Sequence, residues 1–76
     1  MPAHFVYALV EGEIPRYVGY TAQLGRRRRD HRLSRPDWLL LVLGVYNSSA
    51  EALSQEKWWI SRLRGKYKSL EIHHFS

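Results

Sequence analysis

The sequence predicts an α+β fold whose elements follow the order β-β-α-β-α. Three observations lead to this prediction. Two runs of aromatic and β-branched residues flank an early glycine, and one longer apolar run comes later in the chain. One helical pattern precedes this apolar run and another follows it. At 76 residues the chain has room for one modest core, so residues 1–76 are expected to form a single domain.

The first two predicted strands form a β-hairpin. Residues 3–10 and 14–20 are rich in aromatic and β-branched side chains, and Gly12 separates them between two glutamates. Centring the turn on Gly12 places Tyr7 directly opposite Tyr17. The hairpin therefore predicts that these two rings share one face of the sheet.

A strongly basic helix is predicted from about Ala22 to Leu33. Thr21 is a suitable N-cap, and Pro36 stops the helix because the residue before a proline disfavours helical geometry. Leu24 and Leu33 are its few apolar side chains and are expected to touch the core. The helix is thus expected to contribute charge more than packing.

The second half of the chain predicts one strand and one helix. Residues 38–46 are apolar at both odd and even positions, which indicates a strand covered on both faces. Residues 50–64 form the helix, and Ser48 and Glu51 before and within it have capping-box spacing. Residues 69–75 are expected to add a short strand or to remain a tail.

The charge distribution favours a polyanionic partner. Twelve Lys and Arg stand against seven Asp and Glu, for a formal net charge of +5. The basic residues gather in two clusters, one over 26–35 and one over 62–68, which indicates a nucleic-acid track. For three of the four arginines at 26–29, a solvated face that attracts DNA or RNA without chemistry is the simpler interpretation.

Several classes of protein are disfavoured by what the sequence lacks. No cysteine is present, so neither disulfides nor a thiolate metal site are expected, and three Trp, five Tyr and two Phe must provide the packing. The longest apolar run is too short to span a bilayer, and the N-terminal residues do not resemble a signal peptide. A soluble, intracellular protein of the cytoplasm without a membrane partner is the expectation.

Glu56 lies inside the apolar stripe of the second predicted helix. Its neighbours at helical spacing are all apolar: Ala52, Leu53, Trp59, Ile60 and Leu63. A charged side chain in such a position needs a partner because desolvation is costly. Two explanations fit equally, a salt bridge to an arginine of the first helix or a ligand for a hard divalent cation such as Mg²⁺.

Arg27 and His31 lie one helical turn apart on the first helix. The planar fork of arginine suits a phosphate, and a histidine one turn away can donate to or accept from the same group. Arg28 is also within helical reach of His31, so spacing alone does not separate it from Arg27.

The tyrosines of the hairpin have two interpretations. Tyr7, Tyr17 and Tyr20 can simply pack, as aromatic residues in strands usually do. A tyrosine acting as a general base would need its pKa lowered from about 10 by nearby cations or a metal, and the basic helix is a source of such a field. Gly19 is interpreted either as a bulge or as a point where backbone approaches a ligand closely.

At the positions discussed above, the chain resembles the GIY-YIG nuclease family. Phe5-Val6-Tyr7 stands where the first tripeptide belongs, and Tyr17-Val18-Gly19 stands as the second. The family's motif region is matched further by Thr21, Leu24, Arg27 and His31, and its glutamate helix by residues 52–60 around Glu56. The chain departs from the family at Phe5, which replaces a glycine, at Tyr20, where many members carry lysine, and in having no asparagine after the glutamate helix.

The resemblance implies a three-stranded, largely antiparallel sheet flanked by helices, and a metal-dependent endonuclease, a hydrolase that cuts DNA by water attack. Tyr7 would be the general base or would position the water, with Tyr17 as its partner. Arg27 would hold the scissile phosphate, and His31 would support a tyrosine or the phosphate. Glu56 would bind one Mg²⁺ or Mn²⁺, and no organic cofactor is implied.

The expected partner is DNA, with RNA as an alternative. The residues expected to contact the nucleic acid are Gly19, Tyr20, Arg26, Arg28, Arg29 and Arg32. A chain this short has little surface for base readout, so we expect shape recognition, a homodimer or a partner protein that supplies targeting. The alternatives are a catalytically weak or inactive DNA- or RNA-binding module of the same fold, and an interaction protein whose aromatic surface docks on a larger partner.

Overall fold

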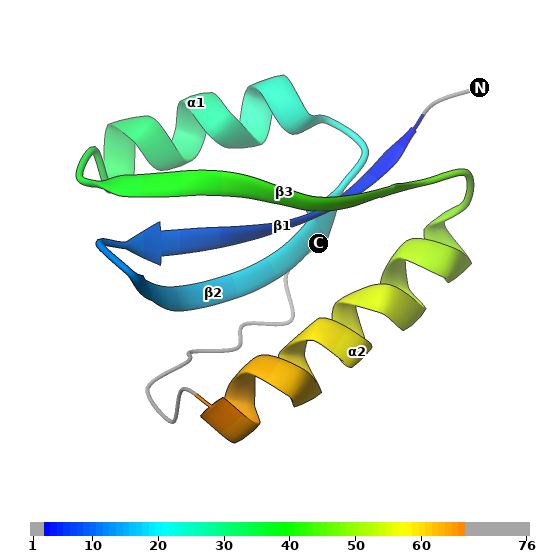
Figure 1. Ribbon diagram of the computed structural model, residues 1–76. Coiled ribbons are helices and arrows are strands. Elements are labelled where there is room, and N and C mark those ends of the chain that lie inside the picture. Colours follow the sequence, from blue (N-terminus) through cyan, green and yellow to red (C-terminus); the bar gives the residue numbers. More distant parts are fainter. Residues whose placement is uncertain (1–2, 67–76) are drawn as a thin grey trace.

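The computed structural model describes residues 3–66 and has the predicted order of elements, β-β-α-β-α. In chain order these are β1 (His4–Glu11), β2 (Ile14–Thr21), α1 (Leu24–Ser34), β3 (Trp38–Tyr46) and α2 (Ser49–Lys66) (Figure 1). The α+β prediction is therefore confirmed. The strand or tail expected over 69–75 lies outside the described residues.

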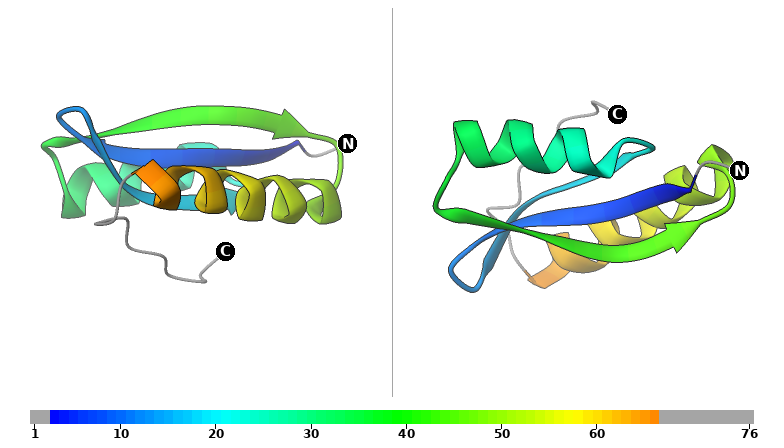
Figure 2. Two further views of the ribbon diagram at one scale, coloured as in Figure 1. Left: turned by 60° about the horizontal axis from the view of Figure 1, so that its bottom comes forward. Right: turned by 90° about the horizontal axis from the view of Figure 1, so that it is seen from above.

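The strands of the described range form one antiparallel sheet in the order β2-β1-β3. Because side chains alternate along a strand, β1 presents Val6 and Ala8 to one face and Tyr7 to the other. The first face packs on α2, while Tyr7 contacts His31 of α1. The helices therefore lie on either side of the strands, as Figure 2 shows from above.

The register of the β1–β2 hairpin differs from the predicted one. Tyr7 pairs with Gly19 instead of Tyr17, a shift of two residues. A shift by an even number keeps each side chain on its predicted face. Tyr7 and Tyr17 consequently remain on one face, as diagonal neighbours and not as directly opposed ones.

Two local features produce this shift. The turn has two central residues and not one, because Glu11 pairs with Ile14, and Gly12 adopts a positive φ of 64° within it. The register then changes again between Leu9 and Val10. Neither feature follows from counting residues outward from the glycine.

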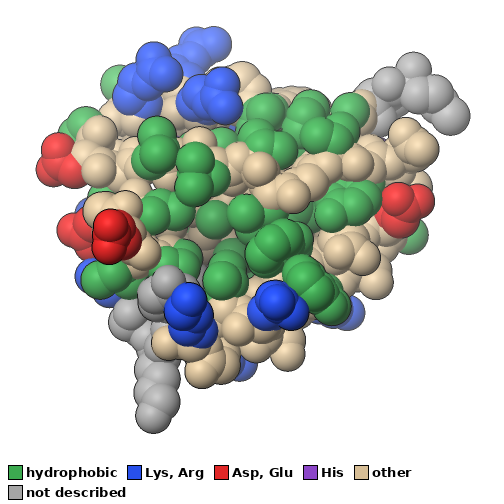
Figure 3. Space-filling view, viewed as in Figure 1, with side chains coloured by type: hydrophobic (Ala, Val, Ile, Leu, Met, Phe, Trp, Pro, Cys, Tyr) green, Lys and Arg blue, Asp and Glu red, His purple; other side chains and the backbone are tan. Residues whose placement is uncertain are grey.

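β3 is an edge strand, and the prediction that both of its faces are covered is wrong. Among the described strands it pairs only with β1, and α2 covers only its Leu43 and Tyr46 end. Leu39 is 60% exposed and Val45 is 58% exposed. Apolar side chains consequently form a band across the face seen in Figure 3.

α1 begins at Leu24, two residues later than predicted, and Thr21 does not cap it. The Thr21 Oγ1 instead accepts a hydrogen bond from the backbone N–H of Gln23, at 2.9 Å, in the turn before the helix. Leu33 is 78% exposed, so the expected core contact at this position is wrong. No residue of α1, all of which is described, is buried, which confirms that this helix contributes charge more than packing.

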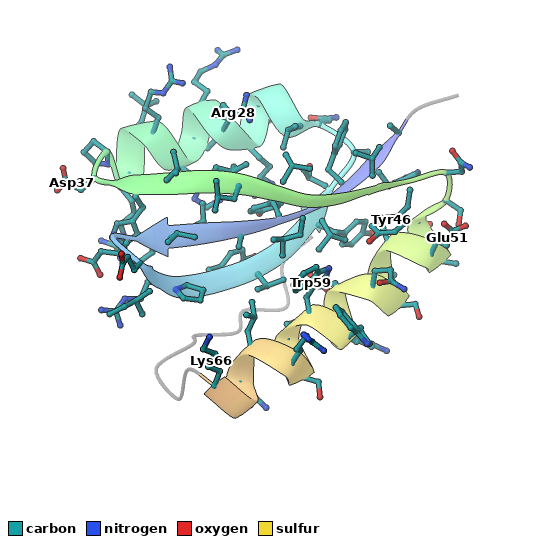
Figure 4. The ribbon with its side chains drawn as sticks, in the orientation of Figure 1. Arg28, Asp37, Tyr46, Glu51, Trp59 and Lys66 are labelled. Atoms are coloured by element: carbon teal, nitrogen blue, oxygen red, sulfur yellow. The ribbon has the colours of Figure 1, made fainter. Side chains whose placement is uncertain are left out.

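α2 begins as its capping signal predicts. The Ser48 Oγ accepts a hydrogen bond from the backbone N–H of Glu51 at 3.1 Å. One stripe of the helix then covers the sheet: Ala52 is fully buried against β1 and β2, and Trp59 points from α2 toward the strands (Figure 4). Neither α2 nor any other helix in residues 3–66 is long and apolar enough to cross a membrane.

Candidate functional site

Three aromatic side chains from three elements meet on the α1 side of the sheet. The ring centroids of Tyr7 and Tyr17 are 6.0 Å apart, and that of His31 lies 5.9 Å from Tyr7 and 6.2 Å from Tyr17. These separations are those of interacting aromatic pairs. We call these three residues the tyrosine–histidine cluster; it joins β1, β2 and α1.

Gly19 makes room for this cluster. A Cβ atom at position 19 would lie 2.7 Å from Cε2 of Tyr17 and 2.9 Å from the hydroxyl oxygen of Tyr7. The sequence suggested a bulge or close approach of a ligand at Gly19. The structure shows regular pairing with Tyr7, so the bulge interpretation is wrong, and it places atoms of both tyrosine side chains beside the glycine.

Tyr7 is 0% exposed. Its hydroxyl lies beside the Tyr17 phenol but has no hydrogen bond of standard geometry within residues 3–66. Burial, and after it the neighbouring Tyr17, raises the pKa of Tyr7 far above its ordinary value, and the positive charge of Arg27 offsets only part of this. The basic helix therefore does not turn Tyr7 into a base, and the phenol is neutral at pH 7.

His31 is also neutral at pH 7. Burial lowers its pKa, and the positive charge of Arg27 lowers it further, against a smaller opposing effect of Asp30. The Nε2 atom of His31 is buried and has no hydrogen-bond partner in the part of the chain that the structure describes. The cluster thus holds a neutral imidazole with an unused ring nitrogen, alongside neutral phenols.

The structure separates Arg27 from Arg28. The charge of Arg27 acts on all three rings of the tyrosine–histidine cluster, and its side chain is half-buried. Arg28 is exposed and contributes to none of these pKa shifts. Arg27 is therefore the arginine of α1 that faces the cluster.

Glu56 reaches the same region from α2. It is only 8% exposed. Burial raises the pKa of Tyr17, and the negative charge of Glu56 adds to this effect and also raises the pKa of Tyr7. Arg27 and Glu56 thus both act on Tyr7 and Tyr17, and Arg27 also acts on His31, although the five residues that the resemblance implied as catalytic come from β1, β2, α1 and α2.

The donor atoms around Glu56 fit a hard divalent cation. The buried carboxylate of Glu56 acts electrostatically on the phenols of Tyr7 and Tyr17, and Mg²⁺ and Mn²⁺ prefer oxygen ligands. Between residues 3 and 66 no three or more His, Cys, Asp or Glu side chains gather into a metal-binding group. The expected coordination is one carboxylate completed by waters and substrate phosphates, which is a common way of holding Mg²⁺.

The remaining residues predicted to contact nucleic acid are distributed around α1. Tyr20 and Arg26, together with Arg27, line a cavity of about 450 Å³ where β2 passes into α1. Arg28 and Arg32 line a different depression, beside Trp38 at the start of β3, and Arg29 is exposed. The predicted set is therefore divided between two surfaces of α1.

Several residues of the first cavity were not predicted to be functional, among them His4, Gln23 and Asp30. His4 has no metal-ligand spacing in the sequence, and Gln23 lies in a short connection without a motif. The cavity forms where the start of β1 meets the end of β2 and the first turns of α1. No local sequence pattern predicts that these segments of β1, β2 and α1 come together around a cavity.

Comparison with known proteins gave no matching family model, no matching curated protein and no matching solved structure. The resemblance to the GIY-YIG nuclease family stays a hypothesis that depends on the residues quoted for it.

One prediction separates Arg27 from Arg28 in solution. Arg27→Gln is expected to raise the pKa of His31, because the variant removes a positive charge that disfavours the imidazolium, while burial still holds the pKa below its ordinary value. Arg28→Gln is expected to leave this pKa unchanged. An NMR titration of the His31 ring protons measures both; equal shifts in the two variants would contradict the assignment of Arg27 to the cluster.

Proposed function

We propose that this chain is a divalent-metal-dependent phosphodiesterase that cuts DNA internally by water attack. The convergence of two phenols, an imidazole, a guanidinium and a carboxylate on one region, from four elements, is the observation that supports this proposal. Each residue has an ordinary structural explanation when taken alone. Together they supply phosphate binding, proton handling and a cation ligand, which phosphodiester hydrolysis requires.

The geometry suggests a division of roles. Arg27 offers a bidentate donor for the scissile phosphate, and the unpaired Nε2 of neutral His31 offers a hydrogen bond to the attacking water or to a phenol. Glu56 would hold the Mg²⁺ or Mn²⁺. Bound there, the cation would neutralise charge that develops on the phosphate and the leaving oxygen.

Tyr7 suits the positioning of water better than its deprotonation in the metal-free protein. Its pKa is raised by burial, so the neutral phenol donates a hydrogen bond at pH 7. A role as general base would require an additional positive charge close to the oxygen to lower that pKa. Tyr17, whose pKa burial also raises, would share the hydrogen bonding with Tyr7.

The test is incubation of the purified chain with supercoiled, single-stranded and branched DNA, each with Mg²⁺, with Mn²⁺ and with EDTA. Cleavage of at least one substrate is expected with a metal and none with EDTA, because the proposed mechanism uses a divalent cation on Glu56 to stabilise charge that develops on the phosphate. A parallel RNA substrate decides between DNA and RNA. Absence of metal-dependent cleavage on every substrate would overturn the proposal.

The second candidate is a nucleic-acid-binding module that does not cut. The raised tyrosine pKa values favour it, since neutral phenols can bind a strand without activating water. It requires the exposed arginines of α1 to carry most of the binding, through counterion release.

This candidate makes its own prediction. Replacing Arg28, Arg29 and Arg32 together by Gln is expected to weaken DNA binding and to reduce the slope of log affinity against log salt by roughly 2 to 3, about 0.9 for each phosphate that the variant no longer neutralises. Fluorescence anisotropy over a salt series measures the slope. Retained, salt-dependent binding by the wild type with no cleavage would favour this module over the nuclease, whereas an unchanged slope in the triple variant would exclude these three arginines from the binding surface.

A further inference from the structure

The cavity at the junction of β2 and α1 has the size of a small-molecule site. Its volume of about 450 Å³ lies within the range of roughly 300 to 1,000 Å³ that is usual for ligand pockets. It is lined by the start of β1, the end of β2, the connection 21–23 and the first turns of α1. This cavity is separate from the depression that Arg28 and Arg32 line.

The lining of this cavity combines positively charged, negatively charged and amide side chains. Arg26 and Arg27 supply guanidinium groups for a phosphate. Gln23 and Asp30 add an amide and a carboxylate, which can pair with the donors and acceptors on the edge of a base. A simple anion has no use for the amide, and an apolar ligand would not tolerate two arginines.

One further observation points to a ligand in this cavity. His4 lines the cavity as well, and its Nδ1 is buried without a hydrogen-bond partner within the described residues. Buried polar atoms are usually paired, so an unpaired ring nitrogen at a cavity wall is a place for a ligand to bind.

Arg27 connects this cavity to the tyrosine–histidine cluster. It lines the cavity, and its charge also acts on Tyr7, Tyr17 and His31. A strand whose phosphate lies on Arg27 therefore has an adjoining nucleotide at the mouth of the cavity, with Arg26 next to it.

We infer that this cavity binds the nucleotide that adjoins the scissile phosphate. The inference rests on the proposed function for the identity of the strand. It assigns nucleotide binding to residues other than those proposed to take part in hydrolysis. Arg26 holds the phosphate of that nucleotide, and Gln23 contacts the base edge. The nucleotide subsite makes a single unpaired or splayed-out nucleotide the preferred substrate feature, because a base inside a duplex stack cannot enter a cavity.

The test uses the full chain without metal, in EDTA, so that no cleavage occurs. The four 5′-deoxynucleoside monophosphates and inorganic phosphate are titrated separately while backbone amide NMR shifts are recorded. Each nucleotide is expected to bind more tightly than inorganic phosphate and to shift the amides of Tyr20, Gln23 and Arg26. Nucleotides that bind no more tightly than phosphate, or that shift amides elsewhere, would overturn the inference.

Variants sharpen this test. Arg26→Gln is expected to weaken nucleotide binding by roughly tenfold or more, as expected for the loss of a charge-assisted hydrogen bond. Gln23→Ala is expected to weaken binding of the nucleotides and not of inorganic phosphate. Arg64→Gln, an equal change of charge in the last turn of α2, is the control and is expected to leave both affinities unchanged. An equal loss in Arg26→Gln and Arg64→Gln would mean that only net charge matters and would overturn the subsite.

The outcome is distinguishable from failure of the proposed function. Nucleotide binding in the cavity without any metal-dependent cleavage of DNA would leave the subsite in place and overturn the nuclease. Cleavage of DNA by the wild type, with no nucleotide binding in the cavity and with unchanged cleavage by Arg26→Gln, would leave the nuclease in place and overturn the subsite.

Discussion

Glu56→Gln is expected to reduce metal-dependent DNA cleavage by roughly 10²- to 10³-fold or more while the chain stays folded. The amide preserves the size of the side chain but removes the charge that would hold the cation. Loss of metal binding costs several kcal/mol of transition-state stabilisation, at about 1.4 kcal/mol for each factor of ten. The cleavage rate at saturating Mg²⁺ or Mn²⁺, measured under single-turnover conditions, gives the effect directly.

A second measurement on the same variant does not depend on activity. The negative charge of Glu56 adds to burial in raising the pKa of Tyr17, so Glu56→Gln is expected to lower that pKa. Spectrophotometric titration of the phenols measures the change. Glu51→Gln is the matched control, because Glu51 lies in the first turn of the same helix and is exposed. Unchanged cleavage in Glu56→Gln, or an equal loss in Glu51→Gln, would remove Glu56 from the site.

Gly19→Ala is expected to disable the site without removing any polar group. The added methyl would lie 2.7 Å from the Tyr17 ring and 2.9 Å from the Tyr7 hydroxyl oxygen. Tyr7 is fully buried and cannot move away, so the half-buried Tyr17 has to swing outward. Overpacking of this kind costs about 1 to 3 kcal/mol of unfolding free energy, and cleavage is expected to fall as the Tyr7 and Tyr17 rings separate.

Denaturant unfolding measures the stability of Gly19→Ala, and ring-to-ring NMR contacts between Tyr7, Tyr17 and His31 report the cluster itself. Gly65→Ala is the control, since a Cβ at position 65 meets nothing within 4 Å and the residue lies in the last turn of α2. This control is expected to be neutral or slightly stabilising, because alanine favours a helix over glycine. Gly19→Ala with unchanged stability and unchanged ring contacts would contradict the packing role of Gly19.

The sequence predicted the order of elements well, because strand and helix periodicities are local. It also predicted correctly that Tyr7 and Tyr17 share a face. Side chains alternate between the two faces of a strand, so a change of register by two residues leaves each side chain on the same face. The sequence did not predict the register, which depends on a two-residue turn at Gly12 and on an irregularity between Leu9 and Val10. The exposure of β3 was missed because an apolar run does not reveal its place in the sheet.

The candidate site was predictable only in part. The resemblance singled out Glu56 and Arg27, and the structure places both charges where they act on the two tyrosines. Spacing alone could not choose between Arg27 and Arg28, since the choice depends on which side of α1 faces the sheet. The sequence could not predict that the pKa of Tyr7 is raised and not lowered, because burial of Tyr7 decides the direction and not the number of nearby arginines.

The candidate site combines residues from both ends of the described chain, so its parts are synthesised at different times. Tyr7 lies on β1, the first strand, and Glu56 lies on α2, the last helix described. A ribosome releases the hairpin and the basic α1 before α2, and an early segment can already attract nucleic acid through its arginines. Under the proposed function, the arginines that would attract a strand are therefore synthesised before the carboxylate that would bind the cation.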